Sequence, residues 1–258
     1  MLGIMATRRL AALAALLGAL GLLAGCPKQP EFVMEEPGRP SVTWQNDTRG
    51  AARAPDEHAQ PDEHAQKVAE RELLSEIHDA ERKGTDELAL ASAFYNLAIL
   101  RRQQKEFADS DKFYRKALEI RERKEGPNHP DVATTLNNLA GLEAAQGNYD
   151  AAQPMLERAL TIRQTALGTE HLLTAQSMNN LALLYAAQGN AAAAEPLYLQ
   201  AISVLEKDDG ARSGELDRVL DNYAAMLHET GRDSEAEALE ARARVIRAAA
   251  DQGKDTPH

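Results

Sequence analysis

Two copies of Pro-Asp-Glu-His-Ala-Gln, at residues 55–60 and 61–66, are the densest grouping of side chains that could bind a metal ion. Their spacing matches no zinc motif and no cysteine supports one, so a duplicated solvated linker that runs into a helix is the better interpretation. The other histidines are scattered, without a positioned Ser or Cys nucleophile, and no glycine-rich phosphate loop is present. We therefore predict no catalytic residue, no metal, no cofactor and no enzyme activity.

The start of the chain is typical of an export signal. Arg8-Arg9 precede an apolar run, Leu10 to Leu23, that is too short to span a bilayer. The run ends in Leu23-Ala24-Gly25-Cys26, which resembles the lipobox of bacterial lipoproteins. The resemblance implies that residues 1–25 are a signal peptide, that cleavage follows Gly25, and that Cys26 carries a lipid anchor. The alternative is an ordinary secretory signal with a chance cysteine.

Composition narrows the class of partner. With 1 cysteine the chain can form no internal disulfide, so packing alone must stabilise its fold. The formal net charge of −11 argues against nucleic acid as a partner. Pro27 stands where enterobacterial lipoproteins retained in the inner membrane carry Asp. The resemblance therefore implies an anchor in the outer membrane, facing the periplasm.

Residues 26–60 are predicted to be a disordered tether, because prolines recur there and apolar periodicity is absent. A helix is expected over 61–84, since Pro61 suits a first helical turn and Leu73, Leu74, Ile77 and Ala80 would share one face. This helix would cap the domain that follows. Residues 251–258 are predicted to be a frayed tail.

A repeat with a period of 42 residues organises the remaining chain. Asn137-Asn138-Leu139-Ala140 returns as Asn179-Asn180-Leu181-Ala182, and the phase extends to Asn96 and Asn222. Each unit reads as two helices with apolar residues at steps of three and four, and in the second and third units a Gly-Asn turn separates them. A hairpin of this kind cannot bury its apolar face alone and must stack on its neighbours.

These features resemble the tetratricopeptide repeat (TPR), and the long period resembles the kinesin-light-chain type. Leu139-Ala140, Gly147, Tyr149, Ala152 and Ala159 carry the resemblance. It implies an all-α fold, a right-handed α-solenoid of four TPR helical hairpins with an N-terminal capping helix. The repeats are expected at about 85–126, 127–168, 169–210 and 211–250.

Five positions depart from the repeat pattern or lie between repeats. Lys105 replaces the turn glycine of the first repeat. His129 and His171 occupy equivalent loops, where turn packing or helix capping is the expected role. In the fourth repeat Glu240 and Arg244 replace apolar residues, which suits the polar outer face of a terminal repeat.

In TPR proteins the first helix of each hairpin lines a concave groove that binds another protein. The resemblance implies a peptide-binding groove in this chain, and asparagine recurs there at one register. An amide can donate and accept at once, which suits recognition of a peptide backbone, although bonds between helices are the alternative role. The expected groove residues are Tyr95, Asn96, Arg102, Asn137, Asn138, Ala145, Asn179, Asn180, Leu183, Asp221, Asn222 and Glu229.

We therefore expect a lipid-anchored periplasmic scaffold or adaptor that binds a protein or peptide segment in its groove. The alternative is a structural component of an envelope machine for secretion, pilus assembly or motility, bound through the convex face. A peptidoglycan-processing role would need a hydrolytic activity that the sequence does not show.

Overall fold

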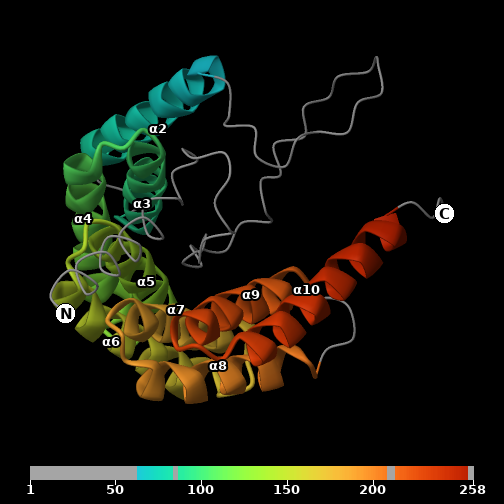
Figure 1. Ribbon diagram of the computed structural model, residues 1–258. Helices are drawn as coiled ribbons and strands as arrows, with labels where there is room; N and C mark the ends of the chain where they lie inside the picture. The colour runs from blue at the N-terminus through green and yellow to red at the C-terminus, as the bar shows by residue number, and fades with distance from the viewer. Residues whose placement is uncertain (1–62, 84–86, 208–212, 255–258) are drawn as a thin grey trace, which may run out of the picture. The chain divides into compact units, whose positions relative to one another are not determined.

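A computed structural model describes residues 63–83, 87–207 and 213–254. All regular elements in these ranges are α-helices, so the predicted all-α fold is confirmed (Figure 1). The predicted signal peptide, Cys26 and the predicted tether lie outside the described residues. In chain order the helices are α2 (Glu63–Lys83), α3 (Glu87–Gln103), α4 (Phe107–Glu125), α5 (Pro130–Ala145), α6 (Tyr149–Leu167), α7 (Leu172–Ala187), α8 (Ala191–Leu205), α9 (Ser213–Glu229) and α10 (Asp233–Lys254).

The eight helices from α3 to α10 form the four predicted hairpins. Each hairpin closes through the same pair of backbone hydrogen bonds. In the second hairpin, for example, Asn148 N–H donates to Glu143 O at 2.9 Å, and Gly147 N–H donates to Ala144 O at 2.9 Å. This is the Schellman arrangement, which needs a left-handed backbone at the residue that follows the helix.

The residue at this left-handed position is glycine in three of the four hairpins. Its φ angle is 82° at Gly147, 77° at Gly189 and 77° at Gly231. The first hairpin places Lys105 there with a φ of 64°. A side chain with a Cβ atom is strained in this region, so the first repeat keeps the turn at an energetic cost.

The helices group into two compact units, and the chain passes from one to the other between Thr135 and Leu136, inside α5. In the unit that ends at Thr135, α2 packs on α3 (Figure 1). Glu70 of α2 accepts a 2.6 Å hydrogen bond from Arg101 of α3. A helix is therefore present where the capping helix was expected, and it contacts the first hairpin.

The unit that begins at Leu136 has a core of small and aliphatic side chains. Leu139 and Leu181 are buried, as are Ala152 and Ala159 on α6. Small side chains at these positions let neighbouring helices approach closely, while the leucines fill the space between them. The rings of Tyr198 and Tyr223 stack at 5.4 Å between centroids and join α8 to α9.

The last helix is longer than the sequence predicted. Helix α10 continues to Lys254, so helix extends into the range predicted as a tail, 251–258. Among the described helices, none combines the length and apolarity needed to cross a bilayer.

Candidate functional site

Three of the predicted groove asparagines lie on the first helices of the hairpins and bond to neighbouring hairpins. Asn222 Nδ2 of α9 donates to Asn179 Oδ1 of α7 at 3.1 Å. Asn137 Nδ2 of α5 donates to Ser177 Oγ of α7 at 3.0 Å. The structure therefore shows the inter-helix role that was the alternative for these residues, and contact with a ligand stays a prediction.

Two arginines that the sequence analysis did not single out are fully enclosed by the repeats. Arg121 on α4 donates from Nη1 to Thr135 Oγ1 at 2.7 Å and to Asp131 O at 3.2 Å. Arg163 on α6 donates from Nη1 to Ser177 Oγ at 2.9 Å and to Leu173 O at 2.9 Å.

The two arginines are equivalent under the 42-residue period, as are their hydroxyl and carbonyl partners. Each guanidinium ties the second helix of one repeat to the first helix of the next. A recurring arginine, followed fourteen residues later by Thr or Ser, was the sequence signal that could have revealed this contact.

Burial acts on both guanidinium groups. It lowers the pKa of Arg163 to about 9. Burial also lowers the pKa of Arg121, but the negative charges of Asp131 and Glu125 partly offset it. Both arginines remain cationic near neutral pH, so each of these two repeat contacts holds a buried positive charge.

Tyr95 and Arg102 of the predicted groove set lie beside one buried tyrosine. The Tyr95 ring packs edge-on against the ring of Tyr114 at 5.6 Å, and the Arg121 guanidinium lies 4.9 Å from the Tyr95 centroid. Arg102 is half-buried near the Tyr114 hydroxyl, whose pKa is raised by burial and lowered in part by Arg102. Tyr95 thus packs in the interior of its hairpin, which differs from a position on a groove surface.

Asp221, one of the predicted groove residues, forms an ion pair with an arginine of α10. Asp221 Oδ2 accepts a 2.6 Å hydrogen bond from Arg247 of α10, which also bonds to Asp217 at 3.1 Å. Glu229 is the last residue of α9 and is exposed. Of the other predicted groove residues, Asn96 and Ala145 are half-buried, and Asn138, Asn180 and Leu183 are buried.

His129 and His171 cap the helices that follow them, as predicted. The N–H of Asp131 donates to His129 Nδ1 at 3.2 Å, and the N–H of Leu173 donates to His171 Nδ1 at 3.1 Å. Each imidazole thereby satisfies a backbone donor in the first turn of a first helix.

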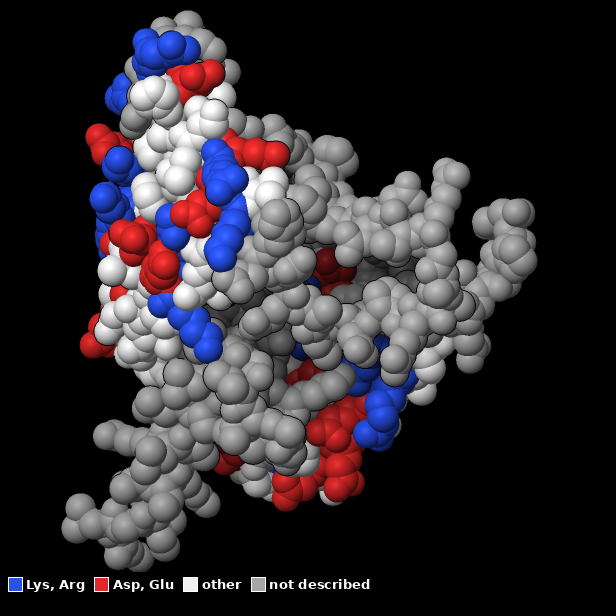
Figure 2. All heavy atoms as spheres, turned by 90° about the horizontal axis from the view of Figure 1, so that it is seen from above, with Lys and Arg blue, Asp and Glu red and all other residues white. Residues whose placement is uncertain are grey.

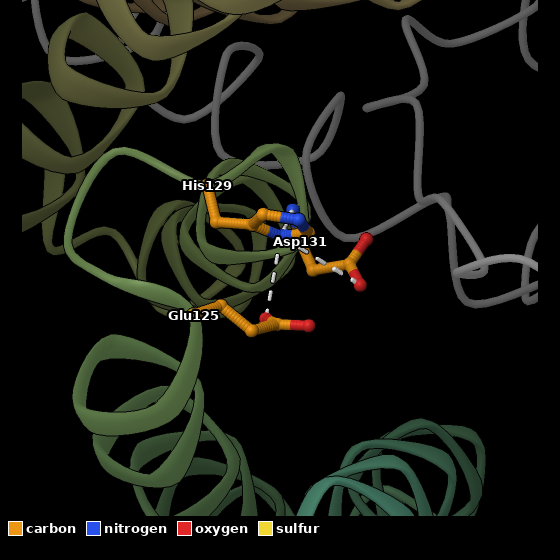
Figure 3. A group of neighbouring side chains, drawn as sticks. All are labelled: Glu125, His129 and Asp131. Carbon is orange, nitrogen blue, oxygen red and sulfur yellow. Dashed lines mark hydrogen bonds and ion pairs between the residues drawn. The ribbon is translucent and has the colours of Figure 1, made fainter.

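The loop around His129 also contains two carboxylates (Figure 3). His129 Nδ1 lies 3.3 Å from Glu125 Oε2 and 3.9 Å from Asp131 Oδ2. One ligand atom of each residue lies within 4.8 Å of the other two, and all three side chains are partly exposed. Sequence spacing did not reveal this cluster, because the turn between α4 and α5 brings the three residues together.

Helical hairpins at a fixed period, each closed by the same turn, define a helical-repeat protein of the solenoid class. The sequence matches the tetratricopeptide repeat model over residues 89–165, 131–207 and 173–248, which together cover more than half of the chain. The chain belongs to the tetratricopeptide repeat family.

Solved structures show the same fold. BtubC (BKLC) from P. vanneervenii is similar with a TM-score of 0.67 and 24% identity, over 76% of this chain and 78% of that one. A kinesin-light-chain-like protein with nearly identical TPR-like repeats from Podosopora anserina has a TM-score of 0.61 and 20% identity, over 73% and 90%. The apo form of RapI has a TM-score of 0.61 and 17% identity, over 73% and 72%. No curated protein matches the chain.

Proposed function

We propose that this protein is a lipid-anchored periplasmic scaffold that binds a segment of another protein along the first helices of its repeats. The observation that carries the proposal is the recurring asparagine register on α5, α7 and α9, within a family whose repeats bind proteins and peptides. TPR domains contribute binding surfaces rather than reactions, so the proposal is one of recognition and not of catalysis.

The chemistry of these first helices fits recognition of a peptide backbone. Helix α7, Leu172–Ala187, carries no Asp, Glu, Lys, Arg or His, and its polar groups are hydroxyls and amides. Asn179 uses its Oδ1 atom for Asn222, and an amide has further donor and acceptor capacity. A partner that offers backbone N–H and C=O groups matches this uncharged chemistry, and contact with it requires that the amides of Asn179 and Asn180, which are buried, become exposed.

The surface charge supports a protein partner. Figure 2 shows Lys and Arg side chains interspersed with Asp and Glu on the described part of this face, instead of a broad field of one sign. With a formal net charge of −11, such a surface offers little attraction to nucleic acid.

The anchor is proposed from the sequence alone. Cys26 would be lipidated after cleavage behind Gly25, and residues 26–60 would hold the repeats away from the membrane. With Pro27 next to the anchor, the outer membrane facing the periplasm is the proposed site.

A second candidate is a structural component of an envelope machine, assembled through the second helices. Leu199 on α8 favours it, because this large apolar side chain is 52% exposed. Isolated exposed leucines are common on protein surfaces, so this observation is weaker than the repeated asparagine register.

Site-specific photo-crosslinking in the native membrane separates the two candidates. Ala187 is half-buried at the end of α7, the first helix of the third hairpin. A photoreactive residue at this position should capture a partner, whereas one at Leu199 should not. Asn138→Ala combined with Asn180→Ala should abolish the Ala187 crosslink while circular dichroism still shows the native helix content. Crosslinks from Leu199 alone would support the envelope-machine candidate and contradict binding along the first helices.

A further inference from the structure

The loop between α6 and α7 is equivalent to the loop between α4 and α5. It therefore serves as an internal control for the cluster of Glu125, His129 and Asp131. His171 caps α7 with the geometry that His129 shows at α5. The residues equivalent to Glu125 and Asp131 are Leu167 and Leu173. The same cap therefore forms at His171 without any carboxylate, so the cap does not account for Glu125 and Asp131.

The hydrogen bonds around His129 show which groups face one another. Because Nδ1 accepts the N–H of Asp131, it carries a lone pair instead of a proton, and a metal ion would compete with that N–H for it. Glu125 Oε2 is shielded from solvent and accepts no hydrogen bond from the described part of the chain. One nitrogen and two carboxylate oxygens thus lie within 4.8 Å of one another, close enough for one cation to contact all three after small side-chain movements (Figure 3).

Arg121 lies nearby and supplies one positive charge, but it leaves the carboxylate oxygens available. Its Nη1 hydrogen bonds go to the backbone oxygen of Asp131 and to Thr135 Oγ1. The cluster with neutral His129 and cationic Arg121 therefore retains a net charge of about −1, by formal charges at neutral pH. A divalent cation would meet two negative charges at close range.

We propose that Glu125, His129 and Asp131 form a binding site for a divalent transition-metal ion. One imidazole nitrogen and two carboxylate oxygens are ligands that Zn²⁺ accepts, and three protein ligands leave a position for water. The 3.3 Å between Nδ1 and Glu125 Oε2 equals the separation expected of two ligands at about 2.0–2.1 Å from a tetrahedral ion. Binding would lengthen the 3.2 Å cap and link the end of α4 to the start of α5.

The test is a calorimetric titration of the full, chelator-treated chain with Zn²⁺, and one saturable site per chain is expected. Glu125→Gln combined with Asp131→Asn keeps the shape of both side chains and removes their charge. This variant should bind Zn²⁺ at least about tenfold more weakly. Asp150→Asn combined with Glu237→Gln removes the same charge from exposed positions elsewhere and should leave the affinity unchanged.

The loop around His171 allows the converse experiment, in which a second metal site is introduced. Leu167→Glu combined with Leu173→Asp places the missing carboxylates around His171, so the stoichiometry should rise from one ion to two. Co²⁺ as a second probe should give a visible absorption band that the Glu125/Asp131 variant lacks. Unchanged Zn²⁺ affinity in that variant would place the metal elsewhere, for example at His58 and His64, and would overturn the proposal. Absence of saturable binding in the wild-type chain would also overturn it.

Discussion

The Arg163 guanidinium donates to the Ser177 hydroxyl at 2.9 Å, and neither side chain reaches solvent. The same hydroxyl accepts a hydrogen bond from Asn137 at 3.0 Å. Ser177 therefore joins three helices, α5, α6 and α7, through one oxygen atom. Because that oxygen satisfies two buried donors, the contact between the second and third repeats depends on it.

Removing this oxygen should destabilise the repeats. Ser177→Ala leaves two buried donors without their acceptor, so the free energy of unfolding should fall by about 1–3 kcal/mol. The measurement is the midpoint of urea unfolding, followed by circular dichroism. The contact between the third and fourth repeats shows an apolar alternative. There Leu205 and Val219 occupy the positions equivalent to Arg163 and Ser177, and both are buried.

Arg163→Leu combined with Ser177→Val copies that apolar contact. Replacing a buried charge and its partner by well-packed apolar residues is often neutral or stabilising, so the double variant should be more stable than Ser177→Ala. A double variant no more stable than Ser177→Ala would show that the polar contact cannot be exchanged for the apolar one.

Lys105 should be a point of strain. Its φ of 64° is the left-handed conformation that glycine adopts in the other three hairpins. Lys105→Gly should therefore raise the free energy of unfolding by about 1 kcal/mol. Gly147→Ala should lower it by a similar amount, because a Cβ atom at Gly147 meets nothing within 4 Å and only the backbone conformation is affected. Equal stability of wild type and Lys105→Gly would contradict this account.

The last hairpin should lose stability as the pH rises. His228 Nδ1 lies 2.7 Å from Asp233 Oδ1, and Nε2 lies 3.3 Å from Glu240 Oε1. The hydrogen bond to Asp233 raises the pKa of His228 above 6.5, with burial opposing it and Glu240 assisting. The folded state binds the proton more tightly, so the stabilisation is fully present below pH 6.5 and is lost as the pH rises through the raised pKa of the folded state.

Urea unfolding of wild type and His228→Gln from about pH 5 to about pH 9 measures this effect. The difference in stability between the two chains should be largest at the acidic end and should shrink as His228 loses its proton. A difference that is constant over this range would exclude the proton linkage.

Cys26→Ala tests the anchor. If Cys26 is lipidated, the variant should accumulate as unprocessed precursor or as a soluble species, and incorporation of labelled palmitate should be lost. The measurement is membrane fractionation together with metabolic labelling. A variant that is still processed and still bound to the membrane would show that the resemblance to a lipobox is misleading.

The helical hairpins could be predicted without any structure. The spacing of leucines and alanines, the Gly-Asn turns and the 42-residue period are local or repetitive features, and each predicts helix or turn without knowledge of distant contacts. For the same reason the departure from glycine at Lys105 and the caps by His129 and His171 could be recognised from their place in the repeat. The φ angle and the hydrogen bonds at those residues agree with these assignments.

The partners of the polar side chains, by contrast, depend on how the helices pack. Asn137 and Asn179 were expected to line a groove, yet their register does not say that Ser177 and Asn222 lie within hydrogen-bond distance. Arg163 reads as a surface residue until a neighbouring helix covers it and supplies Leu173 O and Ser177 Oγ. Glu125 meets His129 because a turn folds the chain back. The repeat makes the arginine contact recur in the sequence, but packing decides which atoms meet, so the partners of these side chains are seen only in the tertiary structure.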